Sequence, residues 1–198
     1  SKNYQDHLNM AMAEELGAKF HIAKIGYAKA LQSISFKLSE RLHNHEVLET
    51  NITVDERLNP PSRIEAFHRI GAEQVKNIPD DVETIIIPCG SCNSVVSILY
   101  GVGLFKPKSL KNIVLMGIGN NGSNNLDYIP RRLSIISAVK KLKLTELFRF
   151  DNESGKYNIF HYNLNGSGYC SYSDLMPYNH SGLEFHPRYE GKCMNYIN

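Results

Sequence analysis

The sequence lacks a strong excess of charge of either sign. Its 22 Lys and Arg face 20 Asp and Glu among 198 residues, which gives a formal net charge of +2. The densest basic cluster, VKKLKL at 139–144, alternates with apolar residues and indicates the solvated face of a helix or strand. Binding to nucleic acid or to a membrane surface through the electric field needs a concentrated charge. We therefore expect neither among the partners of this protein.

Long apolar runs are absent as well. No stretch approaches the roughly 20 apolar residues that a membrane-spanning helix requires. The first ten residues, SKNYQDHLNM, have no apolar core of the kind found in a signal peptide. Internal repeats and low-complexity segments are also missing. The hydrophobic content of 42% is ordinary for a globular protein, so we expect a folded cytoplasmic protein.

Cysteines are few, and they stand at Cys89, Cys92, Cys170 and Cys193. The even number permits disulfides, but without a secretory signal a reducing compartment is the default, and a chain of this size does not need such cross-links. Zinc is usually held by two ligand pairs. Cys170 and Cys193 are too far apart in sequence to form a second pair, so we expect no metal site.

The first third of the chain alternates between helical and strand patterns. Spaced apolar residues among good helix formers predict a helix at 3–18, and Gly17 predicts its end. Apolar residues at helical spacing predict an amphipathic helix at 27–45. The other predicted elements of this part are a strand at 19–25, a candidate strand at 46–53, a loop at 58–63 that contains two prolines, and a helix at 64–78 with a glycine inside its pattern.

The middle of the chain predicts a βαβ unit. VETIIIPC at 82–89 is nearly all apolar, which is typical of a strand buried on both faces of a parallel sheet. A helical pattern follows at 93–104, and NIVLMGIG at 112–119 predicts the next buried strand. Strand, helix and strand in succession favour the α/β class with a parallel sheet.

After residue 120 the pattern loosens. NNGSNN at 120–125 predicts a loop, and residues 131–150 carry mixed helix and strand signals. From residue 157 onward the sequence is rich in Tyr, Asn, Gly and Ser, which predicts irregular structure. Because loops on a rigid scaffold carry functional side chains, we expect this part to line a site.

The junction between the predicted strand and helix at 82–104 is the most informative stretch. It consists of small residues with many hydrogen-bond donors: Gly90, Ser91, Cys92, Asn93 and Ser94. Backbone amides at a helix N-terminus lack partners, and the helix dipole favours an anion there, so these residues are candidates for a phosphate cradle. A plain strand-to-helix turn fits the same pattern, and so does a redox-active pair of Cys89 and Cys92.

A second stretch carries a family resemblance. LEFHPRYEGKCMNYI at 183–197 resembles a segment of fold type II pyridoxal-phosphate enzymes, most closely the branch of aminocyclopropane-carboxylate deaminase and D-cysteine desulfhydrase. The stretch at 85–104 resembles the phosphate loop of the same family, and GAKFHI and RIEAFHRIGAEQV occur in the family's order. The matching residues of the first segment are Pro187, Tyr189, Glu190, Gly191 and Lys192, while His186 replaces the usual aspartate and Arg188 the usual valine.

The resemblance implies a three-layer α/β fold, the cofactor pyridoxal 5'-phosphate, and a small amino-acid-like substrate. The turn at 90–94 would hold the cofactor phosphate, and Tyr189 would lie beside the ring as a catalytic residue. Glu190 would face the pyridine nitrogen, where a carboxylate favours the protonated ring, the stronger electron sink for a carbanion. Tyr169, in GSGY at 166–169, would be a further ring-side residue.

The sequence also departs from the family. No segment matches the N-terminal stretch that carries the Schiff-base lysine, and Lys2 and Asn3 have the family's two residues in reverse order. We expect residues 1–55 to be part of the smaller domain, and 56–198 to be the larger cofactor-binding domain, incomplete at its C-terminus. A lysine amine is needed to bind and exchange the cofactor covalently. We therefore expect a homo-oligomer, or a complementary chain that carries this lysine.

Three hypotheses for the function follow. The first is a pyridoxal-phosphate-dependent lyase or deaminase acting on an amino acid, or the larger piece of one. The second is a non-catalytic or degenerate subunit, or a binding protein, on the same scaffold. The third is a thiol oxidoreductase that uses Cys89 and Cys92. The first two hypotheses differ in whether the missing lysine segment is supplied. The third differs from both in requiring redox chemistry of the two thiols.

Overall fold

The computed structural model describes residues 11–19, 59–118, 127–150 and 155–198, and it divides the chain into two units, Ser1–Thr50 and Asn51–Asn198. In the first unit, residues 11–15 are helical. Gly17 follows with φ 89°, its amide donates to Glu14 O, and the amide of Ala18 donates to Ala13 O. This glycine-based C-terminal cap confirms the predicted end of the first helix.

Several predictions fall outside the described residues. These are the strand at 19–25 apart from Lys19, the helix at 27–45, the strand at 46–53 and the loop at 120–125. The domain boundary near residue 55 also stays a prediction. Within the described residues, no helix is both long enough and apolar enough to cross a membrane.

The second unit is built on a parallel sheet, which confirms the α/β class. Its strands are β1 (Thr84–Cys89), β2 (Asn112–Gly117), β3 (Phe148–Arg149) and β4 (Tyr157–Asn163), in the order β1-β2-β4-β3, and each neighbouring pair is parallel. Helix α4 (Asn93–Phe105) connects β1 to β2, so the predicted βαβ unit is confirmed. Because the strands run the same way, Cys89, Gly117 and Asn163 are in register at one edge.

The strand β4 corrects the expectation of irregular structure from residue 157 onward. Polar residues at Asn158, His161 and Asn163 dilute its apolar pattern, so no strand signal stands out. The pairing with β2 decides the conformation, since it satisfies the backbone groups of both strands.

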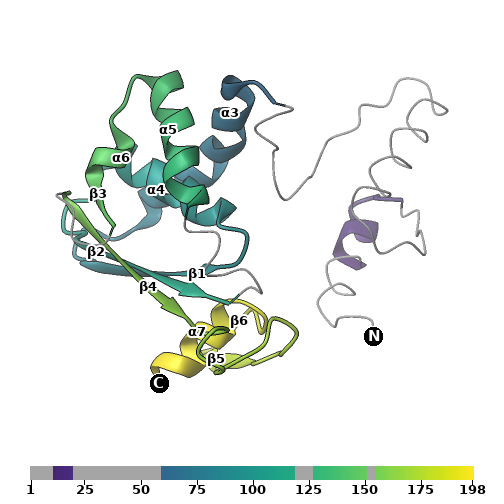
Figure 1. The fold of residues 1–198 in the computed structure, drawn as a ribbon. Coiled ribbons are helices and arrows are strands. Elements are labelled where there is room, and N and C mark those ends of the chain that lie inside the picture. Colours follow the sequence, from purple (N-terminus) through teal and green to yellow (C-terminus); the bar gives the residue numbers. More distant parts are fainter. Residues whose placement is uncertain (1–10, 20–58, 119–126, 151–154) are drawn as a thin grey trace. The chain divides into compact units, whose positions relative to one another are not determined.

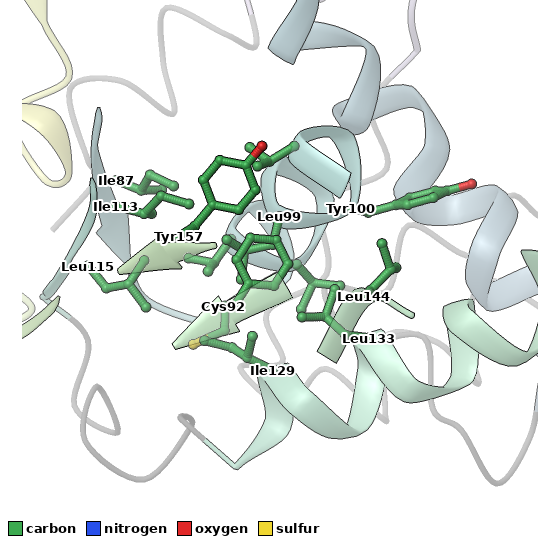
Figure 2. Packing of buried hydrophobic residues seen from close by; sticks show 14 of the residues in the cluster. Ile87, Cys92, Leu99, Tyr100, Ile113, Leu115, Ile129, Leu133, Leu144 and Tyr157 are labelled. Atoms are coloured by element: carbon green, nitrogen blue, oxygen red, sulfur yellow. The ribbon is translucent and has the colours of Figure 1, made fainter. Parts of the chain in front are cut away.

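Helices cover one face of the sheet (Figure 1). They are α3 (Pro61–Ala72), the 3-10 helix η1 (Glu73–Asn77), α4, α5 (Tyr128–Lys140) and the short α6 (Leu144–Leu147). Figure 2 shows side chains of α4, α5 and the strands meeting in this core. The labelled members are Ile87, Cys92, Leu99, Tyr100, Ile113, Leu115, Ile129, Leu133, Leu144 and Tyr157.

The opposite face is covered mainly at the carboxyl ends of the strands. There α7 (Glu190–Ile197) packs near the hairpin of β5 (Tyr178–His180) and β6 (Leu183–Phe185). Its Cys193 shares a small apolar cluster with Met116 of β2. In the middle of the strands, Ile86 of β1 is 43% exposed and Phe160 of β4 is 45% exposed. The expectation that β1 is buried on both faces is therefore wrong for the first part of the strand, whereas α4 and α7 both contact β1.

Two helix boundaries also differ from the sequence prediction. The loop expected at 58–63 ends early, because α3 already begins at Pro61. A proline suits the first helical position, since it needs no amide partner there and its φ is already helical. The helix expected at 64–78 ends at Ala72 and continues as η1. At 139–144 the lysines are exposed while Leu144 is buried, which confirms the predicted solvated face.

Candidate active site

The turn from β1 to α4 is the first part of the site. Cys89 ends β1, Asn93 begins α4, and Cys92 is the N-cap residue between them. The Cys92 backbone is left-handed, with φ 64°, and its side chain makes no capping hydrogen bond. The first amides of a helix have no intrahelical acceptor. The N-cap therefore leaves these amides available to an anion, which the helix dipole also attracts.

Neighbouring helices fix the beginning of α4. The Tyr128 hydroxyl of α5 donates to Asn93 Oδ1 at 2.6 Å, and the Ser97 hydroxyl donates to Asn93 O at 3.1 Å. Ser97 Oγ lies 2.9 Å from Nδ1 of His68, a buried residue of α3. Burial, and secondly the charge of Arg132, lowers the pKa of His68 to about 4, so its ring is neutral at pH 7. The turn is thus held in place before any ligand arrives.

Tyr189 lies next to this turn. A Cβ atom added to Gly90 would lie 3.8 Å from Cε1 of Tyr189, an ordinary contact distance. Two residues that the sequence assigned to one site are therefore brought together. The ring of His186 lies 4.9 Å from the Tyr189 ring, centroid to centroid. Burial, and secondly the hydrogen bond with Tyr172, raises the pKa of Tyr189 to about 12, so its phenol keeps its proton at neutral pH.

Tyr172 is a site residue that the sequence did not single out. Its hydroxyl lies 3.1 Å from the Tyr189 hydroxyl. The buried Lys192 holds its backbone: Nζ donates to Ser171 O at 2.6 Å and to Tyr172 O at 3.1 Å. The Arg188 guanidinium lies 5.3 Å from the centre of the Tyr172 ring. The only sequence signal was the general expectation that the Tyr- and Ser-rich part lines a site.

Tyr169 and Glu190 lie at helix α7. The ring of Tyr169 packs edge-on against Tyr196 of α7, with 5.0 Å between centroids, and is 38% exposed. Among the described tyrosines, Tyr172 rather than Tyr169 bonds to Tyr189. Glu190 is exposed and is the first residue of α7, where a carboxylate also suits the helix dipole. The ring-side roles of Tyr169 and Glu190 stay predictions.

The thiols of Cys89 and Cys92 lie behind the turn. Both are free and buried, and their sulfur atoms are 3.0 Å apart. Across the described ranges, no group of three or more His, Cys, Asp or Glu gathers as a metal site. Cys170 and Cys193 belong to the separate apolar cluster around Met116.

The donor set at the turn suits a phosphate group. The first-turn amides, the exposed Ser91 and the small Gly90 leave the approach to the backbone open, and Asn93 Nδ2 lies 3.4 Å from Ser91 Oγ. The Tyr189 ring beside Gly90 gives an aromatic wall for a planar ring attached to that phosphate. The residues present thus fit a phosphorylated aromatic cofactor.

Comparisons with known proteins support the type of cofactor. No protein-family model and no solved structure matches the chain. A curated protein is similar to it: the O-seryl-dTMP PLP-dependent decarboxylase of Salmonella phage ViI is 34% identical over 230 aligned residues. The alignment covers 97% of this chain and 54% of the relative, so the chain spans about half the relative's length. The expected likeness to pyridoxal-phosphate enzymes is confirmed through this relative, whereas the deaminase branch is not. Over nearly its whole length, the chain is thus similar to a PLP-dependent decarboxylase.

Proposed function

We propose that this chain is the phosphate- and ring-binding part of a pyridoxal-phosphate-dependent lyase, and that the reaction is the decarboxylation of an amino acid. The observation that carries the proposal is the position of Tyr189 next to Gly90 of the turn, with Cε1 3.8 Å from where a Cβ atom on Gly90 would lie, in a chain similar to a PLP-dependent decarboxylase. The name of that relative points to a seryl group linked through oxygen to a thymidine nucleotide as the substrate class.

The turn at 90–94 would bind the cofactor phosphate through backbone amides and the side chains of Ser91 and Asn93. Tyr128 and Ser97 hold Asn93 in place, so binding does not have to order this turn, and the entropic cost of association is lower. Tyr189 would pack beside the ring, and Tyr169 would lie further out. Pyridoxal phosphate, once bound, supplies the electron sink that stabilises a carbanion at the substrate's α-carbon.

Tyr189 is suited to give a proton rather than to take one. With a pKa of about 12, its hydroxyl is protonated at neutral pH. Loss of carbon dioxide leaves the α-carbon in need of a proton, and a positioned acid accelerates such a transfer. Tyr189 Oη would donate that proton, and the Tyr172 hydroxyl at 3.1 Å would replace it.

Glu190 would face the pyridine nitrogen and keep it protonated, which strengthens the electron sink. Its exposed position at the start of α7 leaves the carboxylate accessible to a bound ring. The lysine that anchors the cofactor would come from a complementary chain. Lys192, although close to Tyr172, already donates to two backbone carbonyls.

The binding step can be tested with two variants at one exposed position. Ser91→Asp places a carboxylate at the helix N-terminus, where it competes with the phosphate, whereas Ser91→Asn has nearly the same shape without the charge. Isothermal titration of the purified chain with pyridoxal phosphate should show binding for the wild type and for Ser91→Asn. The Asp variant should bind on the order of tenfold more weakly or worse, because two anions share one site.

The reaction can be tested with the same chain in an assembly that supplies the anchoring lysine. Release of carbon dioxide from an O-seryl thymidine nucleotide should depend on pyridoxal phosphate and on Tyr189. Cofactor binding without any turnover would favour the alternative, a non-catalytic subunit built on this scaffold. Equal binding by Ser91→Asp and Ser91→Asn would show that the turn is not the phosphate site.

A further inference from the structure

The pair Cys89 and Cys92 has no role in the proposed reaction. Their Sγ atoms lie 3.0 Å apart, and the two residues are only 0% and 2% exposed. Cys89 is the last residue of β1 and Cys92 the N-cap of α4. The two sulfur atoms therefore belong to the residues at the two ends of the turn that is the candidate phosphate site.

The backbone holds this contact at a cost. Cys92 has φ 64°, a left-handed conformation that a residue with a Cβ atom rarely adopts. Such a conformation persists only where the surrounding structure imposes it, and it is found preferentially at functional sites. Cys92 shares the main core cluster with Cys89, so packing fixes both sulfur atoms.

The electrostatics divide the pair into two unequal thiols. The two sulfur atoms share a hydrogen bond in which either can be the donor, and this hydrogen bond lowers the pKa of Cys89. The pKa of Cys92 is raised by the same hydrogen bond and by burial. A thiolate is the reactive form of cysteine, so the lower pKa favours Cys89 as the attacking sulfur.

We propose that Cys89 and Cys92 form an oxidisable dithiol that a small peroxide closes to an intramolecular disulfide. The Cys89 sulfur attacks one oxygen of hydrogen peroxide, the O–O bond breaks, and the departing oxygen takes a proton and leaves as water, which gives a sulfenic acid. The Cys92 sulfur then attacks the Cys89 sulfur, and the second oxygen leaves as water with the remaining proton. Two thiols and one peroxide give one disulfide and two waters, so two electrons pass from sulfur to oxygen.

A small peroxide rather than a larger disulfide is the co-reactant because both cysteines are buried. Closure also acts on the turn. A disulfide bond is about 2.05 Å long, so the sulfur atoms must approach by about 1 Å. Cys92 is the N-cap of α4, and its shift misaligns the amides that follow it. Oxidation should therefore weaken phosphate binding, a consequence that rests on the proposed function.

The test of the dithiol uses the full chain. The reduced protein is treated with hydrogen peroxide, unfolded, alkylated with N-ethylmaleimide and weighed by mass spectrometry. Two of its four cysteines should escape alkylation, a dithiol reductant should restore them, and a digest should show Cys89 linked to Cys92. Alkylation of all four, a link between Cys170 and Cys193, or irreversible oxidation would each overturn the proposal.

Two variants control this result. Cys170→Ala with Cys193→Ala should keep the protected pair, and Cys92→Ser should abolish it. The digest of the wild-type protein decides the outcome even where a variant does not fold. Titration with pyridoxal phosphate should then show at least fivefold weaker binding by the oxidised protein, and equal affinity would overturn the effect on the turn. If the reduced protein does not bind the cofactor at all, the proposed function fails, and the disulfide mapping stands on its own.

Discussion

The hydroxyl oxygens of Tyr172 and Tyr189 lie 3.1 Å apart, and the two residues come from the segment between β4 and β5 and from the turn before α7. Tyr189 also lies against Gly90 of the β1–α4 turn. The pair therefore joins the candidate phosphate site to the loop that Lys192 holds in place.

Removing the Tyr172 hydroxyl should change the acidity of Tyr189. After burial, the hydrogen bond with Tyr172 is the next largest cause that raises the pKa of Tyr189 to about 12. Tyr172→Phe should lower that pKa while burial keeps it above the ordinary value. Titration by NMR of protein carrying ring-labelled tyrosine measures it without any cofactor, and Tyr189→Phe assigns the signal. An unchanged pKa would show that the two phenols are not coupled.

The same pair should differ in its effect on turnover. Tyr189→Phe removes the donated proton and should lower turnover by about 10²-fold or more in the lysine-supplying assembly, within the range of general acid catalysis. Tyr172→Phe should lower turnover by a smaller factor, because water can return to Tyr189 the proton that Tyr172 would otherwise supply. Single-turnover decarboxylation rates measure both. A larger effect for Tyr172→Phe would exchange the two roles.

Glu190→Gln separates an electronic role from a structural one. If Glu190 protonates the ring nitrogen, the variant should bind pyridoxal phosphate nearly as well as the wild type, since the turn at 90–94 is untouched, while turnover falls strongly. The two quantities come from isothermal titration and single-turnover kinetics. Equal losses of binding and rate would instead give Glu190 a structural role at the N-terminus of α7, where its charge stabilises the helix.

The stability of the fold should depend on pH through His68. Burial lowers the pKa of His68 to about 4, from an ordinary value of 6.5. Between these values the unfolded chain binds a proton that the folded chain does not, so stability falls as the pH drops from 6.5 to about 4. The full loss is about 3 kcal/mol. Urea unfolding of the wild type and of His68→Gln measures it, and the variant should lack this part of the dependence.

The close approach of α3 and α4 gives a prediction about packing. A Cβ atom on Gly101 would lie 2.3 Å from the backbone oxygen of Ala72 and 2.6 Å from Cγ2 of Val75. Gly101→Ala should therefore destabilise the fold by about 1–3 kcal/mol. The exposed Ser134→Ala on α5 is the control and should change stability by less than about 0.5 kcal/mol. A neutral result for Gly101→Ala in urea unfolding would mean that the helices separate easily.

The elements that the sequence predicted well are those with a strong local signal. The apolar run that became β1 (Thr84–Cys89), the helical spacing of α4 (Asn93–Phe105) and the next apolar run at β2 (Asn112–Gly117) each contain their own evidence. The strand β4 (Tyr157–Asn163) was missed because its polar residues hide the pattern, and only pairing with β2 makes it a strand.

For the candidate site, the sequence by itself predicted the type of cofactor and proposed the turn at 90–94 and Tyr189 as site residues, because these depend on short motifs. Only the tertiary structure decided that Gly90 meets Tyr189, and that Tyr172 rather than Tyr169 is bonded to it. The reason is physical. A motif fixes the conformation of neighbouring residues through local hydrogen bonds and sterics, whereas contacts between distant segments depend on how the strands align and on which side chains the packed core leaves at their ends.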